Sequence, residues 1–259
     1  MYENLLYEVT DGVAHITLNR PQVYNALSPD LIREITEAVH AAGADASVRV
    51  LMLTGTGEKA FCSGADLKAG MGEATSLGDA LRKRYNPMIR AIRNIPKPVV
   101  CRLNGVAAGA GCSLALACDV IIAAEEAYLS QIFVNIGLMP DAGSTFFLPR
   151  LVGTAKAFEL ASTGRKVFGP EAAQLGLIQR AVPAAELDAA VAEVVTYYRQ
   201  APTKAIGAMK QVLNQSMQSD LDTMLEHEAV EQDKLGATRD AGEGIMAFLQ
   251  KRKPEYQGL

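Results

Sequence analysis

The run AFCSGADLK occupies residues 60–68, and a second run of small residues, NGVAAGAGC, occupies residues 104–112. Each run follows an apolar, β-branched stretch, residues 48–54 before the first and residues 98–103 before the second. Small residues let the backbone approach a ligand closely, and the N–H groups that open a helix attract anions. Two such amides aimed at one point would form an oxyanion hole for a carbonyl oxygen. The two runs therefore predict strand–turn–helix units with an anion-stabilising site at their turns.

The sequences of both runs resemble the signature segments of the crotonase, or enoyl-CoA hydratase/isomerase, superfamily. The resemblance extends from residues 19–27 to residues 243–252 in the family's order and at its usual spacings, so it covers essentially the whole chain. It implies an α/β fold, a crotonase-like spiral of repeated ββα units with a C-terminal helical trimerisation region. We therefore expect an α/β core with the active site over residues 1–195, a helical oligomerisation region over residues 196–259, and a homotrimer or a dimer of trimers.

Composition indicates a soluble globular protein and argues against several partners. The chain has 259 residues, of which 49% are hydrophobic and 21% are charged, which is ample for a sizeable core. A net charge of −4 offers no basic face to nucleic acid or to an anionic membrane surface. The N-terminal segment lacks a signal-peptide pattern, and the longest apolar run, residues 120–124, is too short to span a bilayer. We expect a cytoplasmic protein.

The four cysteines, Cys62, Cys101, Cys112 and Cys118, lie in apolar or tight segments without C-x-x-C spacing. Reduced thiols are therefore expected, and neither a disulfide framework nor a zinc site is predicted. Cys62 lies next to the expected oxyanion hole, where it is either a nucleophile or a small buried filler. Its surroundings favour the filler.

Hydrophobic periodicity outlines an α/β core followed by helices. Ser28 and Pro29 form the N-cap and first position of a predicted helix. A longer helix is predicted over residues 76–95, with a kink at Pro87. Repeated strand–helix units imply an α/β core, and from Pro183 onward the pattern is helical.

The resemblance implies which amides form the oxyanion hole. In the family they belong to the alanine of the GAD motif and to a small residue of the second turn, which correspond here to Ala65 and Ala110. Both lie where a helix is expected to begin, so the helix dipole would add to their hydrogen bonds. The alternative for both residues is tight packing without a ligand.

The carboxylates that mark the family's hydratases are replaced in this chain. Those enzymes carry one glutamate just after the second turn and another further along, and the two together orient and activate water. Here the corresponding positions hold Ser113 and Phe133. Neither side chain is a general base, which argues against straightforward hydratase activity. Phe133 instead predicts an apolar wall beside the acyl group.

Asp141 offers a replacement for the missing carboxylates. It lies in the segment GLMPDAGST, residues 137–145, where the resemblance places the acid/base of 1,2-epoxyphenylacetyl-CoA isomerases and a functional aspartate of the dehalogenase and naphthoate synthase branches. A single carboxylate suits a proton shuttle, and burial in an acyl pocket would raise its pKa. The alternative is a helix N-cap. The three histidines, His15, His40 and His227, are expected to be structural or solvated.

The resemblance also implies how coenzyme A is held. We expect no metal and no tightly bound cofactor, with coenzyme A entering as part of an acyl-CoA thioester substrate. Lysines beside the adenosine 3′-phosphate would act as point charges, and a solvated-surface role for them stays open. The expected contacts lie in the N-terminal segment, the first turn, the acyl wall and, from a neighbouring subunit, the C-terminal helix: Asn25, Ala26, Leu27, Gly64, Asp66, Leu67, Lys68, Phe133, Phe248 and Lys251.

Three functions follow from these residues. The leading one is an acyl-CoA isomerase, of enoyl-CoA or epoxyphenylacetyl-CoA type, that works through a thioester enolate with Asp141 moving protons. The second is an enoyl-CoA hydratase-like enzyme of weak or different activity. The third is a non-catalytic CoA-binding oligomer that has lost both glutamates. The presence of Asp141 beside an intact oxyanion hole favours an enzyme.

Overall fold

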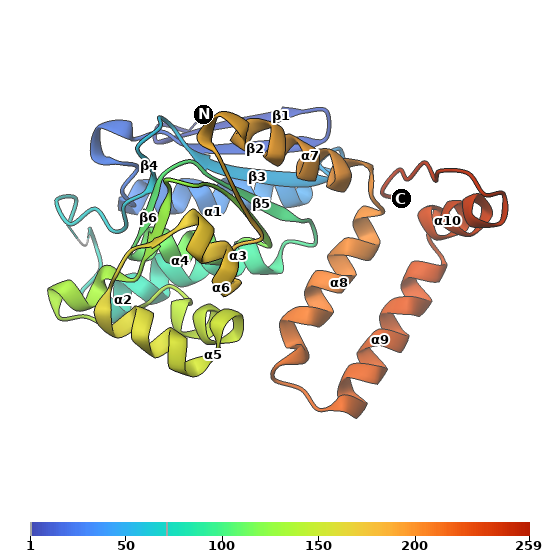
Figure 1. Cartoon of the computed structure of the whole chain (residues 1–259). Helices are drawn as coiled ribbons and strands as arrows, with labels where there is room; N and C mark the ends of the chain where they lie inside the picture. The colour runs from blue at the N-terminus through green and yellow to red at the C-terminus, as the bar shows by residue number, and fades with distance from the viewer. Residues whose placement is uncertain (1, 71) are drawn as a thin grey trace.

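The computed structural model describes residues 2–70 and 72–259, and its strands form a larger and a smaller β-sheet (Figure 1). In the larger sheet β1 pairs antiparallel with β2, and the later neighbours are parallel. Its strands, in sheet order, are β1 (Leu5–Thr10), β2 (Val13–Leu18), β3 (Val50–Gly55), β5 (Val99–Leu103), β7 (Val120–Ala124) and β10 (Arg180–Val182).

The smaller sheet carries the strand ends that matter for the site. Its strands, in sheet order, are β4 (Ala60–Cys62), β6 (Val106–Ala108), β8 (Tyr128–Ser130) and β9 (Val167–Phe168). Strands β4 and β6 are parallel neighbours, as are β6 and β8. Because the carboxyl ends of parallel neighbours meet at one edge, the two small-residue turns that follow β4 and β6 lie side by side.

The order of elements confirms the predicted spiral of ββα units. Strand β3 leads into β4 and then α2, β5 leads into β6 and then α4, and β7 leads into β8 and then α5. The helices are α1 (Pro29–Ala44), α2 (Leu77–Ala80), α3 (Asn86–Asn94), α4 (Ala110–Leu116), α5 (Ser144–Thr163), α6 (Gly169–Leu175), α7 (Leu187–Gln200), α8 (Thr203–Ser216), α9 (Leu221–Gly236) and α10 (Arg239–Leu249). No helix within the described ranges is long and apolar enough to cross a membrane.

Helix α1 begins as its sequence predicts. Ser28 Oγ accepts a hydrogen bond from Leu31 N at 3.2 Å, and Pro29 occupies the first helical position, where its missing N–H costs nothing. The apolar face of the helix is buried, and it packs against β1, β2 and α3. Helix α7 packs against β3, β5 and β7, so helices cover the central parallel strands.

The helix predicted over residues 76–95 is interrupted before Pro87. It consists of α2, a π-helical turn over Leu81–Tyr85, and α3. In the π-helical turn Asn86 N donates to Leu81 O, and Pro87 then occupies the first turn of α3. The expected kink is therefore a change of hydrogen-bond pattern just ahead of the proline.

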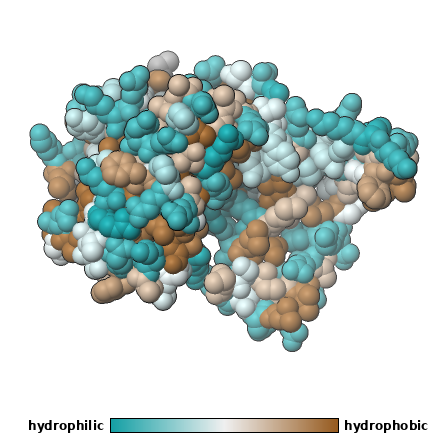
Figure 2. Space-filling view, viewed as in Figure 1, coloured by the Kyte–Doolittle hydropathy of each residue, from teal (hydrophilic) through white to brown (hydrophobic). Residues whose placement is uncertain are grey.

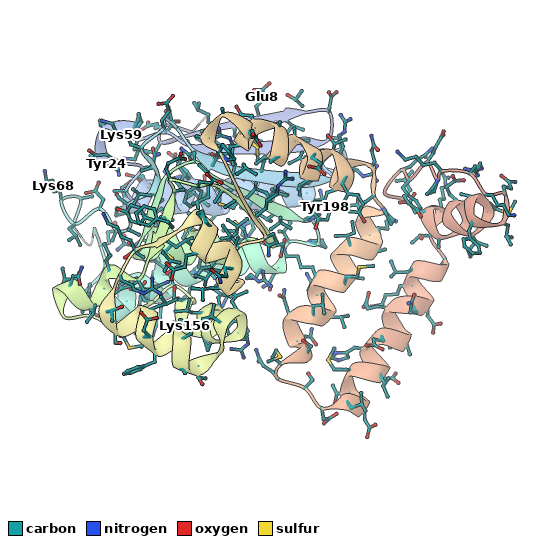
Figure 3. All side chains as sticks on the ribbon, in the orientation of Figure 1. Glu8, Tyr24, Lys59, Lys68, Lys156 and Tyr198 are labelled. Atoms are coloured by element: carbon teal, nitrogen blue, oxygen red, sulfur yellow. The ribbon has the colours of Figure 1, made fainter. Side chains whose placement is uncertain are left out.

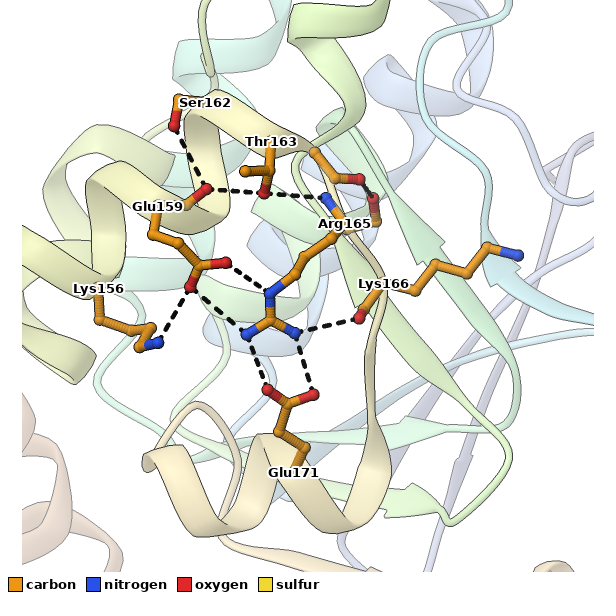
Figure 4. A network of polar contacts seen from close by, with 9 residues as sticks. Lys156, Glu159, Ser162, Thr163, Arg165, Lys166 and Glu171 are labelled. Carbon is orange, nitrogen blue, oxygen red and sulfur yellow. Dashed lines mark hydrogen bonds and ion pairs between the residues drawn. The ribbon is translucent and has the colours of Figure 1, made fainter.

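The far end of α5 is fixed by a polar network shown in Figure 4. The Arg165 guanidinium bridges Glu159 on α5 and Glu171 on α6, with N–O distances of 2.6 and 2.7 Å, and Lys156 adds a contact to Glu159 at 3.1 Å. The guanidinium and its carboxylates are partly exposed, so each pair contributes modestly, but together they tie α5 to α6.

The C-terminal helices extend from the core as an arm of α8, α9 and α10, at the right of Figure 1. Helix α8 is anchored by Lys210, whose buried ammonium donates to Ile92 O at 2.8 Å and to Asp119 Oδ2 at 2.7 Å. Arg49 bonds Thr203 Oγ1 at 2.6 Å at the base of the arm. The predicted domain boundary after residue 195 falls inside α7.

An apolar cleft of about 580 Å³ separates this arm from the core. Figure 2 shows hydrophobic residues gathered in the hollow between the two parts. Phe146 and Phe147 line it from α5, and Met209 and Leu213 line it from α8. Surface of this kind suggests that the isolated chain leaves an interaction face uncovered.

Candidate active site

The first turn, residues 63–67, is fixed by backbone pairing with the segment that precedes α1. Leu27 N donates to Gly64 O at 2.7 Å, and Asp66 N donates to Leu27 O at 3.0 Å. Ala65 lies between the two residues that make these bonds, and its own N–H has no acceptor within residues 2–70 and 72–259. The Ala65 amide is therefore left for a ligand.

Asn25 and Ala26 brace the base of this turn. Asn25 is buried in a left-handed conformation, and its side-chain amide donates to Thr56 O at 3.1 Å and to Ala60 O at 2.9 Å. The carbonyl oxygen of Ala26 accepts from Arg20 Nη1 at 2.7 Å. The predicted contact of these two residues with coenzyme A stays a prediction.

Asp66 holds the same turn from its outer side. Its Oδ2 pairs with Arg20 Nη1 at 2.9 Å, and its Oδ1 accepts from Lys68 N and Ala69 N at 3.1 Å each. Burial alone would raise the pKa of Asp66, but the Arg20 guanidinium and the two amides outweigh it and hold that pKa below its usual range. Asp66 is thus an ionised brace. The Lys68 side chain extends into solvent at the edge of the molecule (Figure 3).

The second turn touches the first through glycine. An added Cβ at Gly64 would lie 2.8 Å from Ala108 O, and one at Gly111 would lie 2.2 Å from Cys62 O. Real Cβ atoms do not approach a backbone oxygen this closely, so both positions require glycine. Ala110 is the first residue of α4, and its N–H has no partner inside the helix.

The two turns open on a cavity of about 320 Å³, which we name the turn cavity. Both Ala65 and Ala110 line it, with apolar walls from the start of α1, from α2 and from the 3-10 turn Ile132–Ile136. Of the residues predicted to hold the substrate, it brings together Leu27, Gly64, Ala65, Asp66, Leu67, Ala110, Phe133 and Asp141.

Other predicted contacts lie outside the turn cavity. Asn25, Ala26 and Lys68 are not among its lining residues. Phe248 on α10 is 83% exposed, and Lys251 follows that helix in a left-handed conformation. Their predicted contact with a substrate held by a neighbouring subunit stays a prediction.

Asp141 contributes a second carboxyl group to the turn cavity, beside that of Asp66, which is paired with Arg20. Its Oδ1 is buried and has no hydrogen-bond partner in the described part of the chain. Burial raises the pKa of Asp141 to about 6. The carboxyl does not cap α5, because Gly143 is the N-cap and Ser144 N donates to the backbone oxygen of Asp141 at 3.0 Å. The capping alternative is therefore wrong, and the carboxyl is left to face the cavity.

A buried polar network holds the backbone of Asp141. Ser113 Oγ donates to Asp141 O at 2.9 Å and contacts Ser144 Oγ at 2.8 Å, and Gln131 Nε2 donates to Ser144 Oγ at 2.9 Å. Ser113 thus supports the loop that carries Asp141, whereas Phe133 lines the cavity. Sequence reasoning missed Ser144 and Gln131, because their separation along the chain gives no sign that they meet.

The other candidate nucleophiles and metal ligands do not form a functional group of the site. Burial raises the pKa of the Cys62 thiol to about 12, which suits a filler and not a nucleophile. His15, His40 and His227 do not line the turn cavity. In residues 2–70 and 72–259 no group of three or more His, Cys, Asp or Glu side chains is placed to hold a metal ion.

Tyr85 is a cavity residue that sequence reasoning did not assign to the site. It ends the π-helical turn Leu81–Tyr85 and lines the turn cavity together with Asp141. The one signal in the sequence was its place directly before Asn86 and Pro87, where a helix must change its hydrogen-bond pattern.

Comparisons with known proteins find similarity to one family over nearly the whole chain. The profile of the enoyl-CoA hydratase/isomerase family matches residues 8–258. A Rhodobacter capsulatus protein named "Probable enoyl-CoA hydratase" is 43% identical over 99% of both chains, and the 1,2-epoxyphenylacetyl-CoA isomerase of Escherichia coli is 37% identical over 100% of both. The crystal structure of an enoyl-CoA hydratase from Bacillus anthracis superposes with a TM-score of 0.93 at 36% identity, covering 99% of this chain and 100% of that one.

Proposed function

This chain belongs to the enoyl-CoA hydratase/isomerase family, and we propose that within it the chain is an acyl-CoA isomerase that works through a thioester enolate. One observation carries the proposal: a single unpartnered carboxyl group, that of Asp141, lies in an apolar cavity with two available turn amides. The positions where the resemblance expects water-activating glutamates hold Ser113 and Phe133.

In the proposed reaction the thioester oxygen accepts hydrogen bonds from Ala65 N and Ala110 N. The Asp141 carboxylate removes a proton α or γ to the thioester carbonyl, and the electrons of the broken C–H bond move into a conjugated enolate. The two amides stabilise the negative charge that develops on the thioester oxygen. Asp141 then returns the same proton to the other end of the enolate, so the double bond moves and no atom is gained or lost.

The environment of Asp141 suits this proton transfer. A carboxyl group with a pKa of about 6 is largely ionised at neutral pH, yet it is a stronger base than an exposed aspartate. The backbone of Asp141 is held by Ser113, which fixes the carboxyl relative to the two amides. A general acid/base in such a position contributes about 10²- to 10⁴-fold to the rate.

A hydratase-like activity is the second candidate, because relatives from Rhodobacter capsulatus and Bacillus anthracis carry that name. Addition of water needs a side chain that orients and activates the water molecule. Phe133 cannot do so, and Ser113 is buried beneath the Asp141 loop. A non-catalytic CoA-binding oligomer is the third candidate, but a carboxyl oxygen that is buried without a hydrogen-bond partner is costly for a protein that only binds.

We also propose that coenzyme A is bound as part of the substrate, near the first turn, and that the protein is a homotrimer or a dimer of trimers. Support comes from the arm, whose apolar side chains have no partner in the described chain. The large exposed apolar residues of α8 to α10 and the connecting segments are Met209, Leu213, Met217, Leu221, Leu225, Val230, Ile245, Met246, Phe248 and Leu249. Apolar side chains gathered on an exposed surface in this way mark a site of interaction with another chain.

A substrate panel tests the activity. Crotonyl-CoA, 3-hexenoyl-CoA and 1,2-epoxyphenylacetyl-CoA would be assayed side by side at equal enzyme concentration. We expect isomerisation of 3-hexenoyl-CoA or of the epoxide to exceed hydration of crotonyl-CoA by at least about tenfold in kcat/KM, a difference of about 1.4 kcal/mol in activation free energy. Faster hydration of crotonyl-CoA would contradict the isomerase proposal in favour of the hydratase.

Sedimentation at micromolar concentration tests the assembly. We expect a species of at least three chains of 27.6 kDa. A stable monomer would contradict the trimer, and it would also remove Phe248 and Lys251 from the substrate contacts.

A further inference from the structure

Tyr85 brings a second polar group to the turn cavity. We propose that its hydroxyl contacts the substrate and selects acyl groups that carry an oxygen atom close to the reacting carbons, such as an epoxide or a hydroxyl. This inference rests on the proposed function, because it assigns a substrate class to the same cavity. It adds a specificity-determining residue that neither the family profile nor the names of relatives supply.

The position of Tyr85 is fixed from two sides. Its ring packs against the hydrophobic core, and its backbone lies at the end of the π-helical turn Leu81–Tyr85. The residue lines the turn cavity together with Ala65, Ala110 and Asp141. A π-helical turn is rare and is frequently found at functional sites.

The Tyr85 hydroxyl is available to a ligand. Within residues 2–70 and 72–259 no hydrogen bond contributes to the pKa of the Tyr85 hydroxyl, and Asp141 Oδ1 has no hydrogen-bond partner. Burial, then the charges of Asp141 and Cys62, raise the pKa of Tyr85 to about 12, while Arg84 opposes them. The hydroxyl is therefore a neutral hydrogen-bond donor at any physiological pH.

The other polar side chains of the cavity are engaged or lie at its rim. Ser63 Oγ donates to Val23 O at 3.4 Å, and Asp66 is paired with Arg20. Asn135 is exposed. Arg84 also lines the cavity and is engaged in another interaction. Among the described polar side chains that line the cavity, Tyr85 and Asp141 thus remain for a ligand.

The unused donor distinguishes two kinds of acyl group. A purely hydrocarbon chain would strip water from the Tyr85 hydroxyl without replacing the lost hydrogen bond. An acyl group with an oxygen near the reacting carbons would accept that bond instead. Sites built around a buried hydrogen-bond donor reject analogues that lack the acceptor far more strongly than apolar pockets reject a small change in shape. The geometry therefore favours oxygenated acyl chains.

Turnover of two substrates tests the inference. The wild-type enzyme, Tyr85→Phe and the control Tyr198→Phe would be assayed with 1,2-epoxyphenylacetyl-CoA and 3-hexenoyl-CoA. Tyr198 is a half-buried tyrosine outside the turn cavity whose pKa is also raised by burial. We expect Tyr85→Phe to lower kcat/KM for the epoxide by about 10- to 100-fold and to change that for 3-hexenoyl-CoA by less than about threefold, with no change in Tyr198→Phe. Equal losses on both substrates, or none on the epoxide, would overturn the inference.

Binding provides a readout that does not depend on catalysis. The dissociation constants of phenylacetyl-CoA and (2-hydroxyphenyl)acetyl-CoA would be measured for wild type, Tyr85→Phe and Asp141→Asn. We expect the hydroxylated ligand to bind about tenfold more tightly than the plain one in wild type and in Asp141→Asn, and the two to bind equally in Tyr85→Phe. An unchanged ratio in Tyr85→Phe refutes the role of Tyr85. Full turnover by Asp141→Asn refutes the proposed function and leaves the binding ratio standing.

Discussion

The turn cavity and the C-terminal arm are held by different kinds of contact. Around the cavity backbone meets backbone, so closely that Gly64 and Gly111 leave no room for a Cβ. Along α9, by contrast, no residue is buried, and apolar side chains such as Leu221 and Leu225 face solvent. The arm depends instead on a few polar anchors at its base, above all Lys210.

This difference shows which part of the chain is complete by itself. The amides and the carboxyl group of the site are positioned by contacts within one chain. The arm has an apolar surface that its own chain does not cover, which is the condition for assembly. Substitutions in the cavity should therefore damage both folding and chemistry, whereas substitutions in the arm should act on local order and association.

The largest effect is expected from Gly111→Ala, which places a Cβ 2.2 Å from Cys62 O. The oxygen belongs to the backbone of the packed core, so it cannot yield without moving a turn. We expect the free energy of unfolding to fall by about 3 kcal/mol, with loss of the oxyanion geometry. Urea unfolding and substrate turnover check this. A variant as stable and active as wild type would mean that the turns do not touch as described.

Lys210→Met should detach the arm without harming the cavity. The methionine keeps the apolar stem but leaves Ile92 O, Lys97 O and Asp119 without the ammonium donor. Since Asp119 retains Arg93, we expect a loss of about 2 kcal/mol in the free energy of unfolding. Hydrogen exchange should quicken in α8 and stay slow in β3 and β5. Uniform quickening across the sheet would show that arm and core are a single unit.

The pH dependence of stability reports on Asp141. Its pKa in the folded protein, about 6, lies above that of an exposed aspartate, so folding favours the neutral carboxyl. The stabilisation is complete below about pH 4 and is lost as the pH rises through 6. We therefore expect Asp141→Asn to gain about 1–2 kcal/mol in stability over wild type between pH 4 and pH 7, after allowance for solvent screening. Thermal melts across that range measure it, and parallel curves for the two proteins would mean that the carboxyl is not desolvated.

The smallest effect is expected from Gly242→Ala in α10, where an added Cβ meets nothing within 4 Å. Alanine restricts the unfolded chain and favours the helix, so we expect a gain of about 0.5–1 kcal/mol. It makes the same change as Gly111→Ala, but in the arm instead of beside the cavity, and the expected change in stability has the opposite sign. A loss of stability in urea unfolding would indicate that a neighbouring subunit fills this space.

Local pattern predicted much of the core. The small-residue runs around Gly64 and Gly111 contain the short strands β4 and β6, which the pattern did not predict, and each strand ends at a turn. Helix α4 begins at Ala110 as expected, whereas no helix begins at Ala65, because α2 starts only at Leu77. Ser28 and Pro29 marked the start of α1, since capping depends on neighbours in sequence. Asp141 was found through its family position, and the structure removed the alternative of a cap.

What the sequence did not reveal depends on contacts between distant segments. The hydrogen bonds that join Gln131, Ser144 and Ser113 form only when the end of β8, α5 and α4 come together. The spacing of these residues along the sequence does not predict that contact. Tyr85 has the helical spacing of a core residue, and its place in the cavity follows from the π-helical turn. The predicted contacts of Phe248 and Lys251 depend on a second subunit, so one chain cannot show them.

The most direct test of the account is the turnover of Asp141→Asn with 3-hexenoyl-CoA and 1,2-epoxyphenylacetyl-CoA, with melting temperature and CoA-ester binding followed in parallel. Asparagine keeps the size of the side chain but cannot accept and return a proton. The account predicts that kcat falls by about 10²- to 10⁴-fold on each substrate that wild type isomerises, while binding and folding persist. Turnover within a few-fold of wild type would contradict the proton shuttle and require another residue to move the proton.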